Sequence, residues 1–140
     1  MTDIEGLVQA VYAALRTGDR PALESVLDND FHGCFTDSLP APIGGSHMGP
    51  TACIDDGWWA IGARWQMVAS PEQFVHGVDG SLTVFGTYQG SARSTRRPVT
   101  AGFAHHWTAA GGRLTSLRQY TDSAAWLAAL GPADTVGTDG

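Results

Sequence analysis

The sequence lacks clustered positive charge. Of its 140 residues, 8 are Lys or Arg and 14 are Asp or Glu, which gives a formal net charge of −6. Nucleic-acid binding normally depends on clustered Lys and Arg, so we expect no nucleic-acid partner. The one basic cluster, formed by Arg93, Arg96 and Arg97, falls in a predicted loop and is typical of a solvated turn.

Cysteine is scarce, and long apolar runs are missing. Cys34 and Cys53 have neither metal-ligand nor redox spacing and do not form a disulfide framework, so we expect free thiols in a reducing compartment. No window approaches the apolar length of a membrane span, and the N-terminus lacks the basic region and apolar run of a signal peptide. These absences predict a soluble, cytoplasmic protein with no membrane partner.

The chain has the length and composition of one globular domain. Its 43% hydrophobic content suffices for a core. We expect a single domain over residues 1–130 and a flexible tail over residues 131–140, which are small and polar.

Helix signals dominate the first half of the chain. Thr2 and Glu5 have the spacing of a capping box, and apolar residues follow at intervals of three and four up to Gly18. Asp19 is placed to cap a second helix. The predicted helices run from about Asp3 to Gly18, from Asp19 to Leu27, from Gly49 to Gly62 and from Ser123 to Leu130.

The second half of the chain has the composition of β structure. Gly111 and Gly112 supply a hairpin turn, and the stretch 36–49, rich in Pro, Gly and Ser, is predicted to be a loop. Helices followed by strands indicate an α+β domain with helices on one face of a curved antiparallel sheet. The predicted strands are 31–35, 66–69, 74–77, 82–90, 98–108 and 113–121.

Several short motifs, in this order, resemble a known superfamily. They are Gly18-Asp19, Gly49-Pro50, Gly86-Thr87-Tyr88, Phe103-Ala104-His105-His106-Trp107, Gly112-Arg113-Leu114 and Gln119-Tyr120-Thr121-Asp122. Together they resemble the SnoaL-like branch of the nuclear-transport-factor-2-like (NTF2-like) superfamily. The resemblance implies a cone, in which a bent antiparallel sheet wraps around the N-terminal helices and encloses a pocket. It also implies a homodimer formed through the outer face of the sheet.

The catalytic residues of three enzyme types in this superfamily can be compared with the residues at the matching positions of this sequence. Polyketide cyclases of this type use a carboxylate at the end of the last strand, and Asp122 matches that position. In the ketosteroid-isomerase pattern, the tyrosine of the first helix aligns with Val11, next to Tyr12. The carboxylic acid of the strand aligns with Ala104, so the isomerase pattern is missing both residues. The Arg and Asp of the limonene-epoxide-hydrolase pattern are missing from residues 82–90.

Three side chains are the catalytic candidates. Asp122 suits both a helix N-cap and a pocket acid or base, because a carboxylate in an apolar pocket has a raised pKa. His105 and His106 are neighbours on a strand and face opposite sides, and alignment with the isomerase pattern favours His106 inward. Val99, Phe103 and Trp107 share the face of His105. We expect this face of the strand to form a packed hydrophobic surface or a dimer interface. Asp37, at the start of the long loop, is the alternative carboxylate.

Aromatic and polar residues of the predicted pocket are the substrate-binding candidates: Tyr12, Phe35, Trp58, Trp59, Tyr88, Trp107 and Gln119. They favour a cofactor-free acid/base enzyme, a cyclase, isomerase or dehydratase, acting on a polycyclic or aromatic small molecule. The alternative is a non-catalytic, dimeric domain that binds a small molecule in the same pocket. No His-x-His or His-x-x-x-His pair is present, so we expect no metal.

Overall fold

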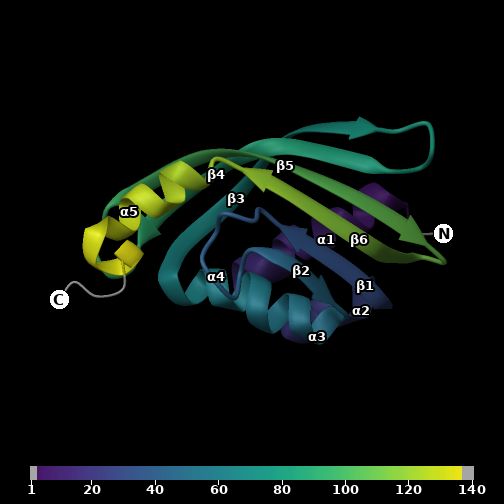
Figure 1. The fold of residues 1–140 in the computed structure, drawn as a ribbon. Coiled ribbons are helices and arrows are strands. Elements are labelled where there is room, and N and C mark those ends of the chain that lie inside the picture. Colours follow the sequence, from purple (N-terminus) through teal and green to yellow (C-terminus); the bar gives the residue numbers. More distant parts are fainter. Residues whose placement is uncertain (1–2, 137–140) are drawn as a thin grey trace.

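The fold is built on one strongly bent six-stranded sheet (Figure 1). The computed structural model describes residues 3–136. The strand order is β2-β1-β6-β5-β4-β3, in which β1 and β6 are parallel and every other pair is antiparallel. The strands are β1 (Leu27–Phe35), β2 (Gly45–Met48), β3 (Trp65–His76), β4 (Leu82–Ala92), β5 (Pro98–Ala110) and β6 (Arg113–Thr121).

Helices lie inside the bend and at one end of the sheet (Figure 1). Asp19 accepts a hydrogen bond from the Ala22 amide at the start of α2, and Gly18 ends α1 in the left-handed conformation, as the sequence predicts. Asp3 caps α1, whereas Thr2 of the predicted capping box lies outside the described residues. The helices are α1 (Ile4–Thr17), α2 (Arg20–Val26), α3 (Pro50–Ala52), the π-helical segment η1 (Cys53–Trp58), α4 (Trp59–Arg64) and α5 (Ser123–Val136).

The predicted α+β class is confirmed, but the sheet is not wholly antiparallel, and four boundaries need correction. β1 begins at Leu27, four residues before the predicted strand 31–35. The stretch predicted to be a loop contains β2, which pairs with β1 from Gly45 to Met48. The two strands predicted at 66–69 and 74–77 are one strand, β3, because its register shift falls at Pro71 on the edge of the sheet, where a missing N–H is tolerated. The last helix, predicted to end at Leu130, is assigned through Val136, with a non-helical break at Gly131.

The core lies between α1 and the concave face of the sheet. Val8, Val11 and Tyr12 of α1 are buried against inward side chains of β5, including Phe103 and Trp107. Burial of such large apolar side chains contributes about 1.5–3 kcal/mol each to folding. In the described part of the chain, no helix is long and apolar enough to cross a membrane.

Candidate functional site

A cavity of about 530 Å³ opens between α1, the η1–α4 region and the concave face of the sheet. Ligand sites commonly have volumes of roughly 300–1,000 Å³. All five tryptophans of the chain line this cavity: Trp58, Trp59, Trp65, Trp107 and Trp126. Its wall is therefore rich in aromatic side chains, which suits a flat apolar ligand.

The exposure of the lining residues distinguishes the floor from the mouth. The floor consists of buried side chains: Tyr12, Trp65, Tyr88, His105, Trp107, Leu117 and Trp126. The mouth is lined by exposed residues: Arg16, Gly18, Gly62, Ala63 and Val68. A ligand that fills the cavity would thus meet buried polar atoms at one end and solvent at the other.

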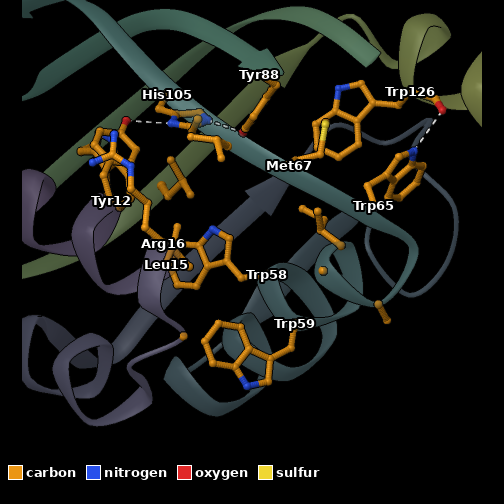
Figure 2. Close-up of a pocket in the computed structure, with 18 residues that line it drawn as sticks. Tyr12, Leu15, Arg16, Trp58, Trp59, Trp65, Met67, Tyr88, His105 and Trp126 are labelled. Carbon is orange, nitrogen blue, oxygen red and sulfur yellow. Dashed lines mark hydrogen bonds between the residues drawn. The ribbon is translucent and has the colours of Figure 1, made fainter. Parts of the chain in front are cut away.

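His105 is the central polar group of the floor. Its Nδ1 lies 2.8 Å from the Tyr12 hydroxyl, and its Nε2 lies 2.6 Å from the Tyr88 hydroxyl (Figure 2). The imidazole stacks on Phe103, with ring centroids 4.0 Å apart and planes inclined by 17°. These contacts fix the ring, because both nitrogens have partners and one face is covered.

Gln119 gives a starting point for the direction of the hydrogen bonds. Its Oε1 accepts from the Thr36 amide, so its Nε2 donates to the Tyr88 oxygen. We assign the Tyr88 hydroxyl, whose oxygen accepts from Gln119, as the donor to His105 Nε2, and the neutral imidazole then carries its proton on Nδ1. His105 Nδ1–H therefore donates to the Tyr12 oxygen.

The chain of hydrogen bonds ends at the Tyr12 hydroxyl proton. With His105 as the donor, that proton has no acceptor among the described residues, and Tyr12 lines the cavity. The buried Trp107 indole N–H, on the same floor, makes no hydrogen bond of good geometry, although it is near enough to the Tyr12 oxygen to oppose the rise in the Tyr12 pKa. Unpaired buried donors are rare in folded proteins. The Tyr12 hydroxyl therefore favours a ligand that brings an acceptor oxygen.

Burial keeps this network uncharged. It lowers the pKa of His105 from 6.5 to about 3 and raises the pKa of Tyr12 and of Tyr88 well above the usual value of a phenol. Desolvation disfavours the charged form of each group. The imidazole is therefore neutral and both phenols are protonated near pH 7, so Tyr12 acts as a hydrogen-bond donor and His105 is a weak base.

Five of the predicted substrate-binding residues line the cavity: Tyr12, Trp58, Trp59, Tyr88 and Trp107. The other two lie behind its wall. Phe35 is buried against Trp58, with ring centroids 6.1 Å apart. Gln119 reaches the cavity only through Tyr88, whose hydroxyl lies 2.9 Å from its Nε2.

The prediction that His106 faces the pocket is wrong. Only one of the two histidines faces inward, as expected, but it is His105. His106 lies on the outer face of the sheet, where its Nδ1 is 3.0 Å from Thr83 Oγ1. His105 faces inward together with Phe103 and Trp107. This face of β5 is buried because α1 packs against it.

The two predicted carboxylates lie outside the cavity. Asp122 is exposed between β6 and α5, and its backbone oxygen accepts from the Ala125 amide. Asp37 is exposed after β1. Neither lines the cavity, and no carboxylate is among the described residues that do.

The sequence did not point to Arg16, Trp65 or Trp126 as pocket residues. Trp65 and Trp126 are T-shaped neighbours at 5.1 Å, and the Trp65 indole donates to the Trp126 carbonyl (Figure 2). The sequence could have indicated Arg16, because it lies four residues after Tyr12 on the same helix and therefore on the same face. The contact between the two tryptophans joins distant parts of the chain and has no local signal.

Comparisons with solved structures identify the fold. An NTF2-like protein of unknown function from Burkholderia pseudomallei is 22% identical, with a TM-score of 0.84 over 94% of this chain and 100% of that one. TerC, crystallised with polyporic acid, is 22% identical, with a TM-score of 0.78 over 89% and 95% of the chains. A protein of ketosteroid-isomerase-like fold from Catenulispora acidiphila, in complex with trimethylamine, is 21% identical, with a TM-score of 0.77 over 95% and 98%.

The chain therefore has the NTF2-like fold that its motifs imply. No family model matches the sequence, and a search of curated proteins finds no match. Proteins of this fold differ widely in activity, so the function must come from the cavity itself.

Proposed function

We propose that this chain binds a largely apolar ring compound in the cavity and holds a carbonyl oxygen of that compound with the Tyr12 hydroxyl. The observation that carries the proposal is the directed series of hydrogen bonds from the Thr36 amide through Gln119, Tyr88 and His105 to Tyr12. As assigned, this series leaves the Tyr12 hydroxyl as an oriented donor in the cavity.

The size and lining of the cavity support this ligand class. An engineered cavity of roughly 150 Å³ holds one benzene molecule, so about 530 Å³ leaves room for two or three fused rings and a substituent. Tryptophan rings on several sides offer stacking and edge contacts, each worth about 0.5–1.5 kcal/mol beyond area burial.

A pair of matched ligands tests the proposal. 2-Acetylnaphthalene carries a carbonyl, and 2-ethylnaphthalene has the same carbon skeleton without an oxygen. Dissociation constants come from quenching of the tryptophan fluorescence. We expect Tyr12→Phe to weaken 2-acetylnaphthalene binding about tenfold, because one hydrogen bond contributes about 1–1.5 kcal/mol. 2-Ethylnaphthalene should bind both proteins within about twofold.

Tyr120→Phe is the matched control. Tyr120 is 55% exposed and does not line the cavity, so this variant should bind both ligands as the wild type does. The proposal fails if neither naphthalene binds. It fails equally if Tyr12→Phe leaves 2-acetylnaphthalene affinity unchanged.

Isomerase or cyclase chemistry is the second candidate, favoured by the same donor. A hydrogen bond to a carbonyl strengthens as the oxygen gains charge, so Tyr12 would stabilise an enolate. The α-proton would pass to a basic group of the substrate or to a solvent base, because the described cavity residues include no carboxylate and His105 is a weak base.

Proton exchange separates catalysis from binding. The α-protons of 2-tetralone exchange slowly in ²H₂O, and NMR follows the loss of their signals. An enzyme of this type accelerates the exchange, and Tyr12→Phe removes most of the acceleration. A protein that binds 2-tetralone without accelerating exchange is a binding domain.

A further inference from the structure

Arg16 is the one charged side chain among the described residues that line the cavity. It is exposed at the mouth, and in the described part of the chain it takes part in none of the ion pairs. Those pairs join Arg20 to Glu24 and Asp55, and His76 to Glu5. Because the chain carries a net charge of −6, this unpaired cation is not part of a generally positive surface.

Tyr12 and Arg16 line the same wall of the cavity. They lie four residues apart on α1, hence on one face and about 6 Å apart along the helix axis. Both side chains leave the helix on the cavity side (Figure 2). Tyr12 is buried and Arg16 is exposed, so one ligand that runs from the floor of the cavity to its mouth can contact both residues.

The chemistry of the two groups differs. The Tyr12 hydroxyl is a neutral donor, whereas a guanidinium offers a planar, permanently charged fork that fits a carboxylate with two parallel hydrogen bonds. An anion at the mouth also keeps its outer side in water, which avoids the cost of burying a charge. The mouth is therefore suited to an acidic group and the floor to a neutral oxygen.

Resting on the proposed function, we propose that the cavity selects ring compounds with a carboxylate at the end opposite the carbonyl, and that Arg16 binds the carboxylate. The ligand class is then an aromatic or polycyclic keto acid. Arg16 determines specificity for the acid, and Tyr12 contacts the carbonyl in acid and ester alike.

The test compares 6-acetyl-2-naphthoic acid with its methyl ester, which keeps the rings and the acetyl group and lacks the charge. Isothermal titration calorimetry gives the ratio of the two affinities. We expect the wild type to prefer the acid about fivefold, the size of a solvent-exposed ion pair. The preference should shrink in 0.5 M NaCl, because salt screens exposed charges.

Two variants locate the source of the preference. Arg16→Gln should bring the ratio close to one, and Arg16→Lys should restore part of the preference. Arg118→Gln is the matched control, because it makes the same change in net charge at an exposed residue of β6 that does not line the cavity. It should keep the wild-type ratio.

The outcomes separate this inference from the function on which it rests. Equal affinities of the wild type for acid and ester overturn the keto-acid class and leave binding through Tyr12 standing. A ratio unchanged in Arg16→Gln also overturns it, and Arg16 then only stabilises the C-terminal end of α1. Failure of 2-acetylnaphthalene, acid and ester alike to bind overturns the proposed function and this inference with it.

Discussion

Lowering the pH from 7 to 4.5 should destabilise the fold through one buried side chain, His105. Folding lowers the pKa of this imidazole from 6.5 to about 3, so below pH 6.5 the unfolded chain binds a proton that the folded chain does not. The neutral imidazole of His105 therefore contributes fully to the free energy of unfolding above pH 6.5. This contribution is lost as the pH falls toward 3. About two pH units below 6.5, at 1.36 kcal/mol per unit, the loss is about 3 kcal/mol.

Urea unfolding followed by tryptophan fluorescence at pH 7.0 and 4.5 measures this loss. Because carboxylates also contribute in this range, two variants isolate the imidazole. His105→Gln keeps a donor and an acceptor for Tyr12 and Tyr88, and its loss should be smaller than the wild-type loss by about 3 kcal/mol. His106→Gln, on the outer face, should keep most of the wild-type loss.

Equal losses in the wild type and in both variants would refute this reasoning. So would an NMR titration in which the His105 imidazole gains its proton near pH 6.5. The same spectra report the tautomer, and the assigned hydrogen-bond directions predict the proton on Nδ1.

The remaining predictions concern packing, the surface carboxylate and assembly. Gly57→Ala should lower the free energy of unfolding by about 1–3 kcal/mol, because its new Cβ would lie 2.8 Å from the Phe35 ring. Gly62→Ala is the control and should change the free energy of unfolding by less than about 1 kcal/mol, because the space around Gly62 is open. Urea unfolding measures both changes. Asp122→Asn should change 2-acetylnaphthalene affinity less than about twofold, because Asp122 is exposed outside the cavity; a larger loss by fluorescence titration would return Asp122 to the site. The homodimer stays a prediction, and Phe85, which is 44% exposed on the sheet, offers a test of it. Phe85→Lys should shift a dimer toward monomer in light scattering. A dimer of unchanged mass would exclude this face of the sheet as the interface.

Local chemistry made most of the fold predictable. Asp19 caps α2, Gly18 ends α1, and Gly111 and Gly112 adopt the positive φ angles of the β5–β6 turn. Each signal lies within a few residues of its effect. The short strand β2 has no such signal, because its pairing with β1 and the contact of His47 with Phe35 are tertiary interactions.

The cavity was only partly predictable. Alternation along β5 shows that one histidine faces inward, but the sequence does not say which face α1 covers. The cavity is lined by residues of α1, η1, α4, β3, β4, β5, β6 and α5, which no local sequence pattern brings together. The direction of Asp122 likewise depends on how β6 leads into α5, which the sequence does not specify.

A crystal structure of the complex with 2-acetylnaphthalene tests the central claim most directly. It should place the naphthalene among the tryptophans and the carbonyl oxygen about 2.6–3.0 Å from the Tyr12 hydroxyl oxygen, the distance of an O–H···O hydrogen bond. A ligand bound outside the cavity, or one whose carbonyl turns away from Tyr12, would contradict it.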